Sequence, residues 1–520
     1  MFIGKKIKEK PVEIALALLL VIQVFLIALS NLTLIEQNLD HNSALLLKHI
    51  ITMWEEKTLV IPQWSYASTL EVDCTTLFAL PLYGLTKNIY LSCALSNVIL
   101  TLILIRVIFL LFDGSDLLYP LICANLVCIP YRVGALDYYN MLFFSGAQYI
   151  VKVLIPLLLI GILLLTEQEK SLAKNGRFWR FTVLYLILLA VSSSSSGVYV
   201  TVYGLAPIIV VYLIHKFLIW ERVPALVYVL IGLSILCVWG GVTVNKMIMG
   251  ETNAGNMVFC SIYDLLLNVS SCFFGLFELI GGNTTDFNAV IFSMDGIIML
   301  SKCCLMIAFL ICGAIAFVKC VKKKGDLRLT LLLSVFVWNY FILNVSNSKH
   351  GVATYEYQYH LIGMLPLMCV TVAIAVKWLR SLSRIQQKWI FLCGLTAFFV
   401  FQGLVFRDLF IRGEQNDSIK ELVTYIEDTD LETVYMYYQN GAPAIARLLD
   451  EDRLYLEANV EGLTQVSDYY SKYKATPVWT ENAIVAVYTG TGIGERFEMG
   501  EHLMVQYASL DNWDLYYFAH

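Results

Sequence analysis

Four carboxylates in the first third of the chain could take part in acid–base chemistry, namely Asp40, Glu71, Asp73 and Asp137. The first three lie in one polar segment, residues 36–88, and Asp137 lies in a later polar loop. A carboxylate near a low-dielectric boundary can have its pKa raised toward neutrality, which suits a general base. Carboxylate oxygens are also preferred ligands of hard divalent cations. Asp40 and Asp137 are therefore candidate catalytic residues, and Asp40, Asp73 and Asp137 are candidate ligands of a Mg or Mn ion.

Asp40 also has a structural interpretation. Residues 43–56 follow it directly, with apolar residues at helical spacing and Lys48, His49 and Glu55 on the other side. An Asp before such a helix can cap its unpaired amides. The sequence leaves both interpretations open, and it predicts that this helix lies in the membrane interface.

The sequence also contains cationic and aromatic side chains that could bind an anionic substrate. Lys302 stands within an apolar run, where a lysine usually faces a cavity or a charged partner, whereas Lys152 could equally extend to the interface. The seven histidines show no spacing typical of a zinc site or a catalytic triad. The predicted substrate-binding residues are Glu71, Asp73, Arg132, Lys152, Lys302, Lys349, Tyr357 and His360.

The elements that must position these residues are membrane helices. The chain of 520 residues is 58% hydrophobic and 15% charged, whereas soluble proteins have about 25% charged residues. This composition makes nucleic acid a poor candidate partner, and the thirteen cysteines fall mostly in apolar runs, as core residues do. About eleven transmembrane helices are predicted, at residues 12–35, 89–112, 117–131, 147–166, 179–193, 199–217, 223–241, 296–318, 328–345, 358–377 and 388–406.

Basic residues predict the orientation. If Lys5 and its neighbours are cytoplasmic, alternation of the spans puts the basic groups at 170–180, 319–328 and 380–388 on the same side, as the positive-inside rule requires. The carboxylates then face outward. We expect a multi-pass protein of the plasma (inner) membrane with a cytoplasmic N-terminus. Residues 1–410 form the predicted membrane domain, with the outer acidic loop 36–88.

Residues 411–520 are predicted to be an extracytoplasmic α/β domain. Acidic residues far outnumber basic ones there, and the patterning indicates helices at 417–426 and 442–449 with strands at 433–438, 483–488, 503–508 and 515–518. The glycine run 490–494 lacks nucleotide-binding spacing and is interpreted as a strand-to-helix loop. The serine run 192–196 is interpreted as a turn between two spans.

The arrangement resembles the GT-C superfamily of integral membrane glycosyltransferases. The resemblance rests on an early Asp after the first helix (Asp40), the later pair Glu71 and Asp73, an Asp after the third helix (Asp137), many further spans and an exported tail. The segments 196–199 and 355–359 are similar to recurring segments of bacterial members. Where those often carry a basic residue, this chain has Val198 and Tyr199 in the first segment and Gln358 in the second.

The resemblance implies transfer of a sugar from a polyprenyl-phosphate donor to an acceptor hydroxyl at the outer face, with inversion and with Asp40 as the base. The implied partners are a lipid-linked sugar, membrane lipid and a glycan, lipid or protein acceptor; no cofactor other than a divalent cation is implied. Two other classes remain open. One is a transporter or lipid flippase without enzymatic activity, and the other is a scaffold in envelope assembly.

Overall fold

The structure is a computed structural model of the whole chain, and it divides into two compact units. Unit 1 comprises residues 1–30, 67–77 and 96–411, and unit 2 comprises residues 31–66, 78–95 and 412–520. The residues that the structure describes are 11–61, 64, 66, 69–134, 136–168, 176–249, 257–282, 290–322, 326–348, 357–411, 416–437, 442–458, 482–491, 493–499 and 502–519.

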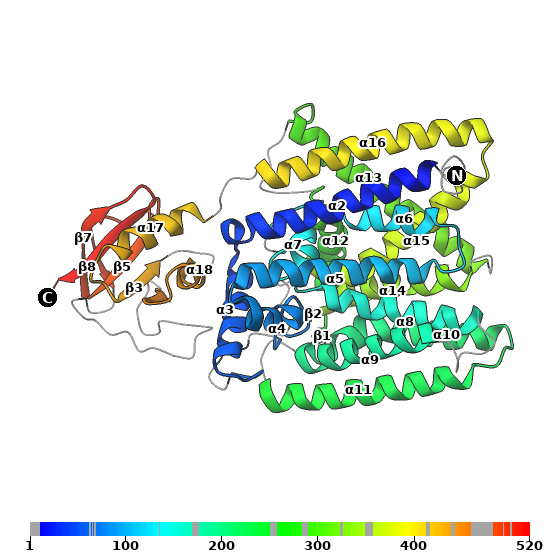
Figure 1. Cartoon of the computed structure of the whole chain (residues 1–520), viewed down its shortest axis with the longest axis horizontal. Coiled ribbons are helices and arrows are strands. Elements are labelled where there is room, and N and C mark those ends of the chain that lie inside the picture. The colour runs from blue at the N-terminus through cyan, green and yellow to red at the C-terminus, as the bar shows by residue number, and fades with distance from the viewer. Residues whose placement is uncertain are drawn as a thin grey trace. The chain divides into compact units, whose positions relative to one another are not determined.

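Unit 1 is a bundle of long apolar helices, several of which run alongside one another in Figure 1. Across the described chain, eleven helices are long and apolar enough to cross a membrane, so the protein is a multi-pass membrane protein. They are α2 (Pro11–Leu34), α5 (Ile89–Leu111), α8 (Ile150–Gln168), α9 (Gly176–Ser196), η3 with α10 (Thr201–Leu218), α11 (Ala225–Met249), α12 (Ile262–Leu279), α13 (Met294–Val321), α14 (Leu327–Val345), η5 with α15 (Tyr357–Arg380) and α16 (Arg384–Ile411).

Helix α8 forms the centre of the bundle. Its sequence is apolar on every side and it is buried along nearly its whole length, as expected for a helix surrounded by other helices. It packs against α9 and α15. By contrast, α11, α13 and α16 expose most of their apolar residues, which is typical of helices in contact with lipid.

Polar contacts define two opposite ends of this bundle. At one end, Arg177 contacts Asp113 at 2.9 Å, Arg328 donates to Ser115 Oγ at 2.6 Å and Arg380 pairs with Asp116. We call this the basic end. The first turns of α8 and α15 and the last turn of α9 lie at the opposite end, which carries Asp73 and Asp137 and which we call the site end.

Two helices differ from the sequence prediction. The segment predicted to span at 117–131 contains only the ten-residue helix α6 (Leu118–Val127). The chain still runs from Asp116 at the basic end to Arg132 at the site end, and residues 128–131 cover the remaining distance as buried non-helical chain. Such backbone is tolerated at membrane depth when it is buried in protein. Helix α12, which the prediction lacked, takes the place of 117–131 among the eleven.

Two short elements complete the site end. Helix α7 (Tyr138–Phe143) follows Asp137, and strands β1 (Met257–Phe259) and β2 (Ser346–Ser348) form an antiparallel pair in which Val258 faces Asn347 along the register. Strand β2 continues directly from α14, so the pair joins the segment before α12 to the site end of α14.

Unit 2 contains the predicted interface helix as α3 (His41–Glu55), preceded by η1 (Glu36–Asn38) and followed in this unit by most of α4 (Thr76–Thr86). One prediction for α3 was wrong: His49 does not lie on the polar face but is fully buried, with its ring stacked on Trp64 at 4.7 Å. Burial lowers the pKa of His49 to about 3. This histidine is therefore a neutral packing residue at physiological pH.

The C-terminal part of unit 2 folds around a six-stranded mixed sheet in the order β4-β3-β5-β8-β7-β6. Strand β3 is parallel to β4 and β5, and the other neighbours are antiparallel. The elements are α17 (Asp417–Glu427), β3 (Thr433–Tyr437), α18 (Ala442–Leu449), β4 (Leu454–Glu457), β5 (Ala483–Tyr488), β6 (Arg496–Met499), β7 (His502–Ser509) and β8 (Trp513–Ala519).

This sheet confirms the predicted small C-terminal α/β fold, with two additions. Strands β4 and β6 were not predicted, because each is only four residues long. As a result, the glycine run after β5 leads to a strand and not to a helix; its Gly490 has φ +92°, a backbone conformation that glycine adopts without steric cost.

Candidate functional site

The first group of polar residues at the site end centres on Arg132. Its Nε lies 3.0 Å from Asp137 Oδ2, and its Nη1 donates to the Glu278 carbonyl oxygen at 3.0 Å. The Tyr357 hydroxyl donates to Asp137 Oδ1 at 2.7 Å, and its ring lies 5.6 Å from the guanidinium. The Arg132 side chain keeps 19% of its surface exposed, whereas that of Asp137 keeps only 3%. We call Arg132, Asp137, Glu278, Lys302 and Tyr357 the Arg132 cluster.

Two glycines allow the side chains of the Arg132 cluster to come together. A Cβ at Gly134 would collide with the Asp137 carboxylate. A Cβ at Gly281, whose φ is +72°, would lie 3.2 Å from Lys302 Nζ and 3.3 Å from the Arg132 side chain. The two cations therefore approach the same glycine from different elements, the loop before α7 and the third turn of α13. Opposite charges and a shared glycine thus bring two cations and two carboxylates together at the site end.

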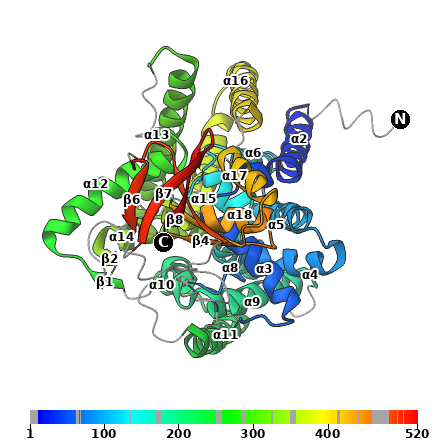
Figure 2. The ribbon, with the colours of Figure 1, turned by 90° about the vertical axis from the view of Figure 1, so that its left-hand side faces the viewer.

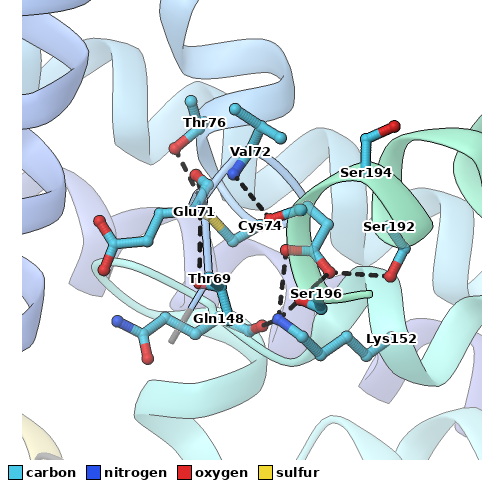
Figure 3. Close-up of polar contacts among 12 residues, drawn as sticks. Thr69, Glu71, Val72, Cys74, Thr76, Gln148, Lys152, Ser192, Ser194 and Ser196 are labelled. Atoms are coloured by element: carbon cyan, nitrogen blue, oxygen red, sulfur yellow. Dashed lines mark hydrogen bonds and ion pairs between the residues drawn. The ribbon is translucent and has the colours of Figure 1, made fainter. Parts of the chain in front are cut away.

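The second group, shown in Figure 3, centres on Asp73, which is fully buried. Lys152 Nζ lies 3.2 Å from Asp73 Oδ2 and also donates to the Gln148 carbonyl oxygen at 2.9 Å. The hydroxyls of Ser192 and Ser196 donate to Asp73 Oδ2 at 2.8 and 2.9 Å. We call Asp73, Lys152, Ser192 and Ser196 the Asp73 cluster. With so many bonds to one buried carboxylate, its partners fix it in place.

The two serines correct the interpretation of residues 192–196 as a turn. These residues form the last turns of α9, where Ser192 and Ser196 are one turn apart and point to the same side. In addition, Val72 N–H donates to Ser195 Oγ at 3.3 Å and Leu70 N–H donates to the Ser195 carbonyl at 3.1 Å. A helix end rich in serine thus anchors the segment that carries Asp73. Sequence reasoning missed these partners, and the serine run was the signal that could have indicated them.

Glu71 lies beside the Asp73 cluster. It adopts φ +54°, uncommon for a residue with a side chain, and Figure 3 shows its side chain directed away from Lys152. Burial raises the pKa of the Glu71 carboxyl to about 7; Lys152 lowers it and Asp73 raises it further, but both effects are smaller than that of burial. This carboxyl therefore changes its charge near neutral pH, as a proton acceptor must.

Tyrosine rings extend from the Asp73 cluster toward the segment that contains Tyr357. Lys152 Nζ lies 5.3 Å from the Tyr149 ring; the Tyr149 and Tyr199 centroids are 6.2 Å apart, and those of Tyr199 and Tyr359 are 6.3 Å apart. The predicted binding residue His360 follows directly, but it is buried, and its Nε2 donates to the Cys272 carbonyl of α12 at 3.0 Å. Its observed contact is thus with the backbone of another helix.

Asp40 belongs to unit 2 and occupies the N-cap of α3. Its Oδ1 accepts from the Ser43 N–H at 3.2 Å, and its Oδ2 accepts from the Ser43 hydroxyl at 2.7 Å. The capping interpretation of Asp40 is therefore observed. A cap does not prevent a carboxylate from acting as a base, so the catalytic role of Asp40 stays a prediction.

The structure groups six of the predicted residues into two clusters: Arg132, Asp137, Lys302 and Tyr357 in one, and Asp73 and Lys152 in the other. The two aspartates are buried and ion-paired, which the predicted outer acidic loop did not indicate. Lys349 lies outside the described residues. Within the described ranges, no three His, Cys, Asp or Glu side chains meet as a metal site, and the predicted divalent cation remains untested.

Comparison with known proteins gives the class of fold. No protein-family model and no curated protein sequence matches the chain. The structure is similar to the crystal structure of ArnT from Cupriavidus metallidurans bound to undecaprenyl phosphate, with a TM-score of 0.57 and 9% sequence identity over 96% of this chain and 97% of that chain. The predicted GT-C fold is confirmed. At 9% identity the likeness shows the fold alone.

Proposed function

We propose that this protein is a membrane glycosyltransferase that moves a sugar from a polyprenyl-phosphate donor to an acceptor hydroxyl. The observation that carries the proposal is the likeness, over nearly the whole length of both chains, to a protein bound to undecaprenyl phosphate. The proposed site lies at the site end of the bundle, which we expect to face away from the cytoplasm.

The Arg132 cluster is the proposed site for the donor phosphate. A guanidinium binds phosphate oxygens through several N–H groups at once, and Lys302 supplies a second positive charge at the same glycine. Glu278 Oε1 lies 3.7 Å from Arg132 Nη1, farther than Asp137 Oδ2 from Nε, so this contact is the weaker one. We expect the phosphate to displace the Glu278 carboxylate while Asp137 keeps Arg132 oriented.

In the proposed reaction, the acceptor oxygen bonds to the anomeric carbon as the bond from that carbon to the phosphate oxygen breaks. The released polyprenyl phosphate takes the electron pair of the broken bond, and Arg132 and Lys302 stabilise the charge on it. Asp40 takes the proton of the acceptor hydroxyl. Attack opposite the leaving group inverts the anomeric centre.

The depth of the polar clusters in the membrane favours a glycosyltransferase over a transporter. Transporter sites usually lie near the midplane, at broken helices. Here the polar clusters lie at the site end, in the first turns of α8 and the last turns of α9. This placement supports chemistry at the membrane surface, where a lipid headgroup and an acceptor hydroxyl can meet.

The test is transfer of radiolabelled sugar from polyprenyl phosphate to an acceptor in proteoliposomes. Arg132→Gln should lose most of the transfer activity, because it removes the guanidinium but keeps a polar side chain. Arg222→Gln is the matched control, since Arg222 is exposed in the loop between α10 and α11. No transfer by the unmodified protein with any lipid-linked sugar, or full activity of Arg132→Gln, would contradict the proposal.

A further inference from the structure

Helix α12 is long enough to cross a membrane, but its contacts place both of its ends at the same end of the bundle. Eighteen residues extend about 27 Å, close to the thickness of the hydrocarbon core. Just before the helix, Cys260 N–H donates to the Val345 carbonyl at 3.0 Å, at the site end of α14. Further along, Asn268 Nδ2 donates to the Asn344 carbonyl at 3.1 Å.

The second half of α12 also contacts the site end. The Cys272 carbonyl accepts from His360, at the start of α15, and the Glu278 carbonyl accepts from Arg132. Just after the helix, Gly281 lies against Lys302. A crossing helix would contact opposite ends of its neighbours. Helix α12 therefore runs across the site end, and Figure 2 shows it extended sideways in a view along the spans.

The surface of α12 divides into three stripes at the 3.6-residue helical period. One stripe, with Asn268, Cys272, Leu276 and Leu279, is buried against the bundle. The second stripe is wide, apolar and exposed: Ile262 is 83% exposed, Tyr263 71%, Leu266 69%, Phe274 52% and Phe273 43%. The third stripe is narrow, lies between the other two and carries Asp264, Ser271 and Glu278 at intervals of seven residues. A helix with a wide exposed apolar face and a narrow polar one suits a boundary between lipid and water.

We infer that α12 lies along the membrane surface at the site end, with Ile262, Leu266 and Phe273 inserted in lipid. Asp264 and Ser271 of the polar stripe are turned to water, and Glu278 at its end contacts Arg132. The partner is the hydrocarbon of the membrane surface, because the apolar exposure continues into the first turns of α13 at Met294 and Ile297. The polar stripe is acidic, so burial of apolar area holds the helix, without attraction to anionic headgroups.

This placement has a consequence for the Arg132 cluster. The last turn of α12 accepts a hydrogen bond from Arg132, so a helix in contact with lipid forms one side of the Arg132 cluster. A lipid-linked anion would thus reach Arg132 along α12. The inference about α12 does not require the proposed transfer reaction, and its test measures position and not turnover.

The first test is thiol labelling by a membrane-impermeant maleimide, with the full chain in membrane vesicles and the unmodified protein as background. Ser271→Cys should be labelled completely. Leu266→Cys, on the apolar stripe of the same helix, should show no labelling above that of the unmodified protein. Arg222→Cys, at the opposite end of the bundle, should label only from the other side of the membrane. Protection of both α12 positions would show a crossing helix, and labelling of both would show a helix in water; either result overturns the inference.

The second test identifies what covers the apolar stripe. Benzoylphenylalanine at Phe273, in nanodiscs that hold one copy of the protein, should form lipid adducts on illumination, detected by mass spectrometry. The same group at Ser271 should form none. The yield at Phe273 should not change when neutral lipid is replaced by anionic lipid. Adducts only within the chain at Phe273 would exclude lipid as the partner.

Discussion

The two roles of Asp40 can be separated by one substitution. Asp40→Asn removes the ability to accept a proton but keeps an oxygen that can cap α3. In the structure, the cap consists of the Ser43 N–H bond to Oδ1 at 3.2 Å and the Ser43 hydroxyl bond to Oδ2 at 2.7 Å. Asn can retain the first bond, and the serine hydroxyl can accept from the Asn amide in place of the second. Asn and Asp are about equally good caps.

The expected magnitudes differ between stability and activity. Asp40→Asn should leave the free energy of unfolding nearly unchanged, whereas Asp40→Ala, which removes the cap, should lower it by about 0.5–2 kcal/mol. Loss of a general base lowers turnover by roughly 10²–10⁴-fold. Sugar transfer should therefore fall by that factor in both variants, although only one of them is destabilised.

The assay is transfer of radiolabelled sugar in proteoliposomes, together with thermal unfolding of the same preparations. Asp40→Ser is the matched control for capping, because serine caps a helix but is no base at neutral pH. Wild-type turnover of Asp40→Asn would refute the role of Asp40 as base. Loss of turnover confined to Asp40→Ala, with Asn and Ser both active, would show that Asp40 serves only as the cap.

Three further predictions concern unit 1. Arg132→Lys should keep a positive charge but lose the planar set of donors, so the KM for the lipid donor should rise more than kcat falls; an unchanged KM would exclude contact with the phosphate. Lys152→Met leaves the Asp73 carboxylate buried without its ion-pair partner and should lower the free energy of unfolding by about 3–5 kcal/mol. The double variant Lys152→Met/Asp73→Leu should recover that stability in denaturation experiments. A double variant as unstable as Lys152→Met would count against the ion pair as the cause. Because burial raises the pKa of Glu71 from 4.5 to about 7, the folded state holds a proton that the unfolded chain has lost. Stability should decrease as pH rises through that window, and Glu71→Gln should flatten the pH dependence of the melting temperature; an unchanged slope would contradict the shift.

Most helices of unit 1 were predictable because a bilayer tolerates few backbone conformations other than a helix. Apolar stretches of about 20 residues satisfy their backbone bonds only as helices, and ten of the eleven predicted stretches overlap an observed long helix, from α2 to α16. The largest difference is at α11, which ends at Met249 and not at residue 241. The tail was also predictable, because its strands and helices switch clearly between periods of two and 3.6 residues. Strands of four residues, such as β4, are too short for that pattern.

Helices α6 and α12 show where local composition does not predict how a segment is placed in the membrane. An apolar helix of 18 residues can lie across a membrane or along it, and only its neighbours decide between the two. Likewise, non-helical chain after α6 is stable at membrane depth because other helices surround it. Neither property is encoded within the segment itself, since both depend on packing partners that are distant in sequence.

The partners of Asp73 show the same limit at the level of single residues. Ser192 and Ser196 follow it by 119 and 123 positions, so no spacing rule connects them with this carboxylate. The Arg132–Tyr357 contact joins residues in the loop before α7 and at the start of α15. Sequence reasoning could identify the charged residues as unusual in a membrane chain, but apart from near neighbours such as Arg132 and Asp137 it could not pair them.

Amino-acid order alone determined the membrane class, most of the long helices, the α/β tail and the set of charged residues that require partners, because these properties follow from hydropathy and local periodicity. Tertiary structure decided which charges meet, that Asp73 and Asp137 are buried in ion pairs, and that α12 runs across one end of the bundle. The physical reason is that an ion pair and a helix direction each depend on several segments at once, and only packing brings those segments together.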